Sequence, residues 1–185
     1  RKHISIASLG EAIKRQTILI NSLSKAYAMT GWRIGYAVGP REIIKAMADL
    51  QSQTTSNPTS IAQKAAIAAL LGSQESIKRM REEFDRRRRF IVERLKAIPG
   101  LRCVEPFGAF YIFPNISAYF GCRFQGRIIR GSVDLAAYLL EEAKVAVVPG
   151  LDFGSDAHIR LSYAISIERI AKGLDRMEGA LRKLI

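Results

Sequence analysis

The chain has 185 residues, of which 48% are hydrophobic and 25% charged, so it is long enough for one compact domain or two small ones and is not expected to be disordered. No apolar run approaches the roughly 20 residues of a membrane span, and we expect no membrane partner. Cys103 and Cys122 form no CxxC pair and have no clustered His, which argues against a disulfide framework and a zinc site. We therefore expect a reduced, cytoplasmic protein.

The net charge of +12 raises the possibility of a nucleic-acid partner, and the run Arg86-Arg87-Arg88-Arg89 is its sharpest support. The run lies inside a helical pattern of apolar residues, however, and acids such as Glu83 and Asp85 are interleaved with it. This pattern favours a solvated helix with intrahelical ion pairs, and we expect no nucleic-acid partner. A non-enzymatic basic module stays open as an alternative, and it predicts affinity that falls steeply with salt.

The first part of the chain is predicted to be α/β. Thr17 to Ser22 is a short β-branched apolar run that indicates a buried strand, and Ile34 to Val38 indicates a second. Helices are expected at about 41–54 and 59–71, the second ended by Gly72. Two strands and two helices cannot cover both faces of a buried sheet, so this part is expected to be incomplete. The chain also begins with Arg1 rather than Met, which likewise indicates a piece of a longer protein.

The pattern changes near residue 75, where we place a boundary between domains 1–75 and 76–185. The second domain is predicted to be α+β, with helices on one face of a small sheet. Its expected helices are 74–97, 132–143 and 166–184, the last capped by Ser166. Its expected strands are 101–105, 109–113, 145–148 and 159–163. Residues 115–131 are expected to form a long connection.

The chemistry-bearing residues gather just after the first strand. Ser22, Ser24 and Lys25 follow it directly, and Arg33 precedes the second strand. The carboxyl end of a buried strand is where open α/β sheets place ligands. Two hydroxyls and a guanidinium suit an oxyanion with several acceptor atoms, such as a phosphate ester. By spacing alone, the pattern favours ordinary loop residues over a ligand site.

Residues 22–36 closely resemble the S-x-S-K-x-x-x-x-x-G-x-R-x-G-Y signature of class I/II pyridoxal-phosphate-dependent aminotransferases, in particular the aspartate-aminotransferase-like group. Later landmarks of that family also appear in the expected order. They are Gly108 to Pro114, Val145 to Gly150, Phe153-Gly154 and Ile159 to Ala164. The resemblance covers essentially the whole chain, which is similar to the C-terminal half of a family member.

The resemblance implies a fold and a set of roles. The fold would be α/β, with part of the large cofactor-binding domain (an α/β/α sandwich of fold type I) followed by the small α+β C-terminal domain. Lys25 would form the covalent link to the aldehyde of pyridoxal 5'-phosphate, and burial would help to activate its amine. Ser22 and Arg33, with Ser24 as a weaker candidate, would bind the cofactor phosphate. Arg160 would bind the substrate carboxylate.

The implied reaction is ping-pong transfer of an amino group from an amino acid, aspartate-like or other, to a 2-oxo acid. Family members are typically homodimers, and Ser56-Asn57-Pro58 would face the partner's site. The family's remaining cofactor ligands lie upstream of the lysine, so the 185 residues by themselves are expected to be inactive or nearly so. Another pyridoxal-phosphate enzyme on this scaffold, such as a β-lyase, stays open, because Lys25, Arg33 and Arg160 would serve both. A lyase would release ammonia or thiol without a 2-oxo acid.

Overall fold

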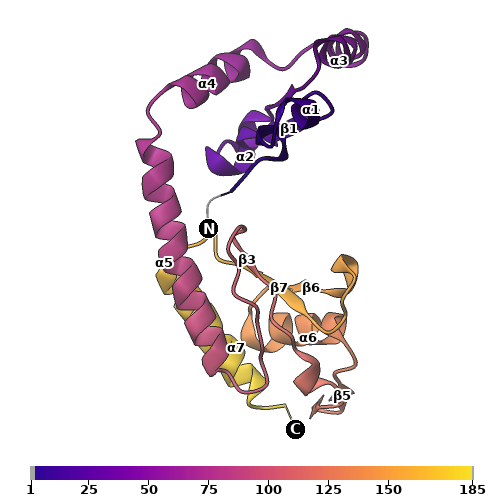
Figure 1. Ribbon diagram of the computed structural model, residues 1–185. Helices are drawn as coiled ribbons and strands as arrows, with labels where there is room; N and C mark the ends of the chain where they lie inside the picture. Colours follow the sequence, from indigo (N-terminus) through magenta and orange to yellow (C-terminus); the bar gives the residue numbers. More distant parts are fainter. Residues whose placement is uncertain (1–2, 185) are drawn as a thin grey trace. The chain divides into compact units, whose positions relative to one another are not determined.

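The computed structural model describes residues 3–184 (Figure 1). The chain forms two compact units, one extending to Arg79 and the other beginning at Met80. Helix α5 (Glu75–Ala97) crosses this boundary. Each unit has its own hydrophobic core, and each is described below by itself.

The first unit contains a two-stranded antiparallel sheet formed by β1 (Leu19–Ser22) and β2 (Gly35–Val38). The strands pair from Leu19 with Val38 to Ser22 with Gly35. The helical elements of this unit are η1 (Ile6–Ser8), α1 (Glu11–Lys14), α2 (Leu23–Ala26), η2 (Thr30–Trp32), α3 (Arg41–Thr54) and α4 (Ser60–Leu71).

The core of this unit is small and lies under the segment that joins the two strands. Leu23, Met29 and Ile34 are buried there together with Ala62 and Ala66 of α4. Helices α3 and α4 match the predicted ranges closely, and α4 ends at Gly72 as predicted. A Cβ at Gly72 would lie 2.5 Å from the carbonyl oxygen of Ala68, so the close turn at this helix end requires glycine.

The prediction that residues 17–22 form a buried strand was wrong in two respects. The strand begins only at Leu19, and its residues from Ile20 to Ser22 are exposed, with Ile20 77% exposed. A sheet of two strands gives β1 a single neighbour, and among residues 3–184 the buried apolar side chains of this unit belong to other segments. The apolar run therefore predicted the strand correctly and its burial incorrectly.

The second unit contains a three-stranded antiparallel sheet in the order β3-β7-β6 (Figure 1). Its strands are β3 (Tyr111–Ile112), β7 (Ile159–Ser162) and β6 (Val148–Pro149). A separate hairpin pairs β4 (Arg123–Phe124) with β5 (Arg127–Ile128). The helical elements are the main part of α5, η3 (Ser117–Tyr119), α6 (Ser132–Tyr138), the π-helix η4 (Leu139–Ala143), η5 (Leu151–Phe153) and α7 (Ile167–Leu181).

Helices α5 and α7 supply one side of the larger core. Apolar side chains recur every three or four residues on both, and this spacing buries Leu95 of α5 with Leu174 and Met177 of α7. An ion pair from Arg94 to Asp175, 2.5 Å long, joins the same two helices at the surface. The predicted N-cap of α7 is confirmed, because the Ser166 hydroxyl accepts a hydrogen bond from the backbone N–H of Arg169.

Several predicted elements of this unit are shorter than expected. Residues 101–105 form no strand, only a bridge between Arg102 and Asn115. The expected strands 109–113 and 145–148 reduce to the two-residue strands β3 and β6. The predicted helix 132–143 is α-helical only to Tyr138 and continues as a π-helix. The expected connection 115–131 contains η3 and the β4–β5 hairpin. Short strands depend on tertiary neighbours, which local patterns do not specify.

No helix within residues 3–184 is both long and apolar enough to cross a membrane.

The core of the second unit generates a stability prediction, in which Leu139→Ala is compared with Leu140→Ala. Leu139 is fully buried, whereas its neighbour Leu140 is 54% exposed. Removing the buried side chain should lower the free energy of unfolding by about 2–5 kcal/mol, because a cavity remains in a packed core. The exposed site should change it by less than about 0.5 kcal/mol. Urea unfolding followed by circular dichroism measures both, and equal losses in the two variants would contradict the described core.

Candidate functional site

The end of β1 and the start of α2 place two hydroxyl groups together. The strand ends at Ser22 and the helix begins at the next residue, so Ser22 is its N-cap. The Ser22 hydroxyl accepts the backbone N–H of Ser24 at 3.1 Å and donates to the Ser24 hydroxyl at 2.9 Å. The pair of hydroxyls is therefore held by the turn itself, at the edge of the sheet where the sequence predicted a ligand site.

Lys25 lies in the same short helix and its side chain is exposed. Leu23, two residues earlier, takes the buried position of the helix. Positions two apart on a helix lie on nearly opposite sides, which leaves Lys25 on the outer side. Residues 3–184 do not themselves supply the burial that we expected to activate the amine, and the activation of Lys25 stays a prediction for the complete protein.

Arg33 reaches the same edge from the second strand. Ser22 pairs with Gly35 in the sheet, and the backbone N–H of Leu23 donates to the carbonyl of Ile34. Arg33, which precedes Ile34, therefore lies close to the end of β1. Arg33 adopts a left-handed backbone (φ 51°, ψ 49°), which is uncommon for a residue with a side chain. Its Nη1 donates to the carbonyl of Thr30 at 2.9 Å, and its side chain is exposed.

These side chains suit a phosphorylated carbonyl compound. A guanidinium has five N–H donors, and the Thr30 carbonyl accepts from one nitrogen of Arg33, so donors remain for a phosphate. The hydroxyl of Ser24 can donate to a further phosphate oxygen, and that of Ser22 can do so when it turns away from Ser24. Lys25 supplies an amine three residues from Ser22. The donor set present in the chain therefore fits pyridoxal 5'-phosphate.

Arg160 belongs to the second unit, where it lies in the middle strand β7 and is half-buried. Its guanidinium carbon lies 4.3 Å from the ring centre of Tyr111 and 4.4 Å from that of Phe153. The sequence analysis identified Arg160 but missed these two rings. The alternation of residues 109–113 could have indicated Tyr111, because it places Tyr111 and Ile112 on opposite faces of a strand.

Ser56, Asn57 and Pro58 lie in the connection between α3 and α4. Ser56 has a left-handed backbone (φ 63°), and the Gln63 side chain donates to the carbonyl of Pro58 at 2.7 Å. The turn is therefore held from within the first unit. Its role toward a partner subunit stays a prediction.

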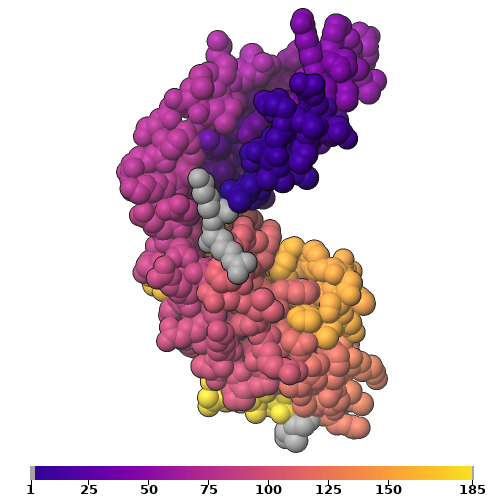
Figure 2. All heavy atoms as spheres, in the orientation of Figure 1, coloured from indigo at the N-terminus to yellow at the C-terminus, as the bar shows by residue number. Residues whose placement is uncertain are grey.

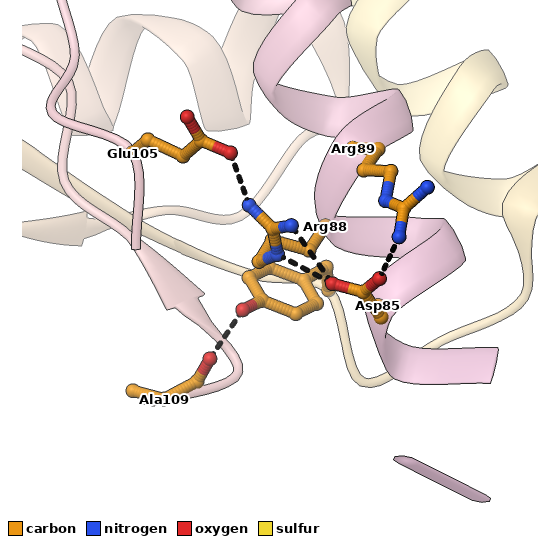
Figure 3. A network of polar contacts seen from close by, with 6 residues as sticks. Asp85, Arg88, Arg89, Glu105 and Ala109 are labelled. Carbon is orange, nitrogen blue, oxygen red and sulfur yellow. Dashed lines mark hydrogen bonds and ion pairs between the residues drawn. The ribbon is translucent and has the colours of Figure 1, made fainter. Parts of the chain in front are cut away.

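The arginine run on α5 is paired with acids, as the sequence indicated. Glu83 accepts hydrogen bonds from Arg86 and from Arg87, each at 2.8 Å from the arginine Nε. Figure 3 shows the other half of the network, in which Arg88 lies between Asp85 and Glu105 while Arg89 pairs with Asp85. All four arginines of the run thus have carboxylate partners within the second unit.

The pairing changes the titration of the acids. The hydrogen bonds from Arg86 and then Arg87 lower the pKa of Glu83 from its ordinary value of 4.5 to about 2. Those from Arg88 and then Arg89 lower the pKa of Asp85. The charged form of both acids is thereby favoured in the folded chain, which makes the arginine run a stabilising network of the helix surface.

The chain matches the family model "Aminotransferase class I and II" over residues 2–177. It is 53% identical over 180 residues to an aspartate aminotransferase of Geobacillus stearothermophilus, covering 95% of this chain and 44% of that protein. It is 49% identical over 185 residues to an aspartate aminotransferase of Bacillus subtilis, covering 99% and 46%. The chain thus spans less than half the length of these curated relatives.

Solved structures resemble the chain equally closely. A crystal structure of an aspartate aminotransferase from Rhizobium meliloti matches with a TM-score of 0.94 and 48% identity, covering 99% of this chain and 46% of that one. An aromatic aminotransferase from Pyrococcus horikoshii matches with a TM-score of 0.86 and 39% identity, covering 98% and 47%. These likenesses confirm the predicted α/β fold class.

The lowered pKa of Glu83 generates a pH prediction for Glu83→Gln. A carboxyl whose pKa is lower in the folded than in the unfolded chain adds stability above its unfolded pKa of about 4.5, and this stability is lost as the pH falls toward about 2. The melting temperature of the wild type should therefore exceed that of Glu83→Gln most between pH 5 and 7. The difference should shrink as the pH falls from 4.5 toward 2, as measured by thermal unfolding followed by circular dichroism.

The matched control is Glu82→Gln. Glu82 is exposed on the same helix turn and forms no ion pair among residues 3–184. A similar pH dependence in both variants would show that the Glu83 ion pairs do not stabilise the folded chain.

Proposed function

The chain belongs to the aminotransferase class I and II family, and from this premise we propose that it carries the lysine-bearing part of a pyridoxal-phosphate-dependent aminotransferase. The observation that carries the proposal is the gathering of Ser22, Ser24, Lys25 and Arg33 at one edge of the β1–β2 sheet. The relatives named above support the same class of enzyme.

We propose further that the chain corresponds to the C-terminal half of such an enzyme. Its coverage of 44% and 46% of the curated relatives supports a piece of about half their length, and the order of the family's landmarks in the sequence supports the C-terminal half. Residues 1–75 would then be the end of the large cofactor-binding domain, and residues 76–185 the small C-terminal domain.

The residues of the first unit have separable roles in this proposal. Arg33 and the hydroxyl of Ser22, with Ser24 beside it, would bind and orient the phosphate, since the planar fork of a guanidinium matches the phosphate oxygens. When bound, pyridoxal phosphate supplies an aldehyde for covalent attachment and a ring that accepts electrons from the reacting carbon. The Nζ atom of Lys25 would hold the aldehyde and, in its neutral form, move a proton to and from the substrate.

Arg160 would bind the α-carboxylate of the substrate. Its guanidinium can form two parallel hydrogen bonds with a carboxylate, which orients as well as attracts the ligand. The proposed reaction moves an amino group from an amino acid, aspartate-like or other, to a 2-oxo acid in two half-reactions.

The complete enzyme is proposed to be a cytoplasmic homodimer. Cys103 and Cys122 are both free thiols, which is consistent with a reducing compartment. Because the family's other cofactor ligands precede the lysine, the 185 residues by themselves should show little or no amino transfer.

Covalent attachment to Lys25 is the direct test of the proposal. The 185-residue chain is incubated with pyridoxal phosphate, reduced with borohydride and digested, and the modified peptides are quantified by mass spectrometry. The cofactor should be found mainly on Lys25, since Ser22, Ser24 and Arg33 lie near this amine, and Lys25→Ala should remove that signal.

Lys45→Ala is the control, because Lys45 is an exposed lysine of the same unit paired with Asp49. That variant should leave the labelling of Lys25 unchanged. Equal labelling of Lys25 and Lys45 in the wild type would contradict a built cofactor site.

The phosphate role of Arg33 is tested by comparing pyridoxal phosphate with pyridoxal, which lacks the phosphate. Arg33→Gln should weaken the binding of pyridoxal phosphate by about 10- to 100-fold, which corresponds to the loss of one charge-assisted hydrogen-bonded contact. Its affinity for pyridoxal should change little. Arg41→Gln removes another exposed arginine of the unit and should alter neither affinity.

Absorbance titrations measure both affinities in each variant. If Arg33→Gln weakened both ligands equally, Arg33 would be acting on the fold of the segment and not on the phosphate.

A further inference from the structure

We propose that Tyr111 and Phe153 form an aromatic clamp that positions Arg160 for a substrate carboxylate. The clamp is defined as these two rings, which the Arg160 guanidinium contacts at 4.3 Å and 4.4 Å. The inference rests on the proposed function, because it takes Arg160 as the carboxylate-binding residue. Tyr111 and Phe153 act through Arg160 and are therefore positioning residues.

The register of the sheet brings Tyr111 to Arg160. Strands β3 and β7 are antiparallel, with Tyr111 opposite Ser162 and Ile112 opposite Leu161. Arg160 and Ser162 lie on the same face of β7, so Tyr111 and Arg160 are diagonal neighbours, within reach of an aromatic and a long side chain. The opposite face carries Ile112, which is buried in the core. A shift of one residue would exchange the two faces, so the core holds Tyr111 in place.

Phe153 packs against a stack of two rings, Phe113 and His158, which directly adjoin strands β3 and β7. Its ring meets that of Phe113 edge-on at 6.3 Å, and Phe113 in turn stacks on the His158 ring at 4.8 Å with an interplanar angle of 12°. The Ser155 hydroxyl and Nδ1 of His158 form a hydrogen bond of 2.7 Å. Phe153 is half-exposed, and the orange segment around η5 lies at the molecular surface in Figure 2. The ring contacts with Phe113 therefore limit the motion of a side chain that is otherwise accessible.

The loop that carries Phe153 is also held through its backbone. The N–H of Gly150 donates to the carbonyl of His158 at 2.9 Å, and a Cβ at Gly150 would lie 2.3 Å from that oxygen. On its other side, the N–H of Leu151 donates to the buried hydroxyl of Ser132 at 3.2 Å, and this hydroxyl donates to Asp156 at 2.7 Å. The loop therefore presents Phe153 from a fixed turn.

The consequence for Arg160 follows from the shape of the guanidinium. The guanidinium carbon lies over both rings, and a guanidinium carries its N–H donors in its own plane, at its edge. Within residues 3–184 no carboxylate lies within ion-pair distance of Arg160, although the arginines of the α5 run all have one. In the proposed clamp, contact with two rings restricts a half-buried arginine, and its N–H donors would serve an external carboxylate. A pre-oriented donor pair loses less conformational freedom when it binds.

The test uses the full 185-residue chain and follows the Nε–Hε NMR signal of Arg160, assigned by its loss in Arg160→Lys. The variants are Tyr111→Leu and Phe153→Leu, with Tyr111→Phe and Phe153→Tyr as conservative counterparts. Phe107→Leu is the matched control, because Phe107 is an exposed ring over a different arginine, Arg88. Two quantities are measured for each chain: the ¹⁵N order parameter of Nε, and the affinity for acetate from the shift of the same signal.

In the wild type, Nε should be rigid and acetate should shift its signal. Both leucine variants should raise the mobility of Nε and weaken acetate binding by about threefold to tenfold, in line with the loss of one cation–π contact. The conservative variants and Phe107→Leu should behave as the wild type does. The melting temperature of each variant is measured as well. If the two rings only stabilise the fold, the leucine variants should lower the melting temperature without changing the order parameter of Nε in the folded state.

Two results would overturn the clamp: an Nε as rigid in the leucine variants as in the wild type, or an acetate affinity that the leucine variants leave unchanged. A third result would bear on the proposed function instead. If both rings restrict Nε of Arg160 but acetate does not shift its signal, Arg160 does not bind a carboxylate. Cofactor attachment to Lys25 is measured separately, so the two failures are distinguishable.

Discussion

The candidate cofactor site depends on one constraint, the antiparallel pairing of β1 with β2. This pairing sets Ser22 opposite Gly35 and so brings Arg33, eleven residues later in the chain, to the edge where Ser22, Ser24 and Lys25 lie. The two backbones approach so closely that a Cβ at Gly35 would lie 2.7 Å from the carbonyl oxygen of Asn21. Glycine at that position is therefore a packing requirement of the site, and the left-handed backbone of Arg33 belongs to the same turn between the strands.

In the second unit, the alternation of side chains along β3 and β7 separates the core residues from those around Arg160. Ile112 and Ile159 point into the core. Because successive side chains of a strand lie on opposite faces, Tyr111 and Arg160 lie on the other face of the same sheet. The core thereby determines which side chains can surround Arg160. Because only one register buries the apolar face, the geometry around the arginine is specified by hydrophobic burial as well as by the contacts of the guanidinium itself.

The densest run of positive charge in the chain is compensated locally on α5. The arginines at 86–89 are matched by Glu83, Asp85 and Glu105, so the most basic segment of the sequence is electrostatically compensated where it lies (Figure 3). Overall charge is a poor guide to partners when acids are placed at helical spacing among the bases. Arg160, like Arg33, has no carboxylate partner within residues 3–184, and its contacts with aromatic rings leave it suited to a ligand.

The sequence by itself determined the longer helices, the end of α4 at Gly72, the Ser166 cap, and the gathering of Ser22, Ser24, Lys25 and Arg33 around one strand end. These features are local: they depend on periodicity, on capping chemistry and on residues close together in the chain. Only the tertiary structure decided that β1 is exposed, that residues 101–105 form a bridge and no strand, and that Tyr111 and Phe153 flank Arg160. Those features depend on contacts between segments tens of residues apart, and local patterns carry no information on which distant segment becomes the neighbour.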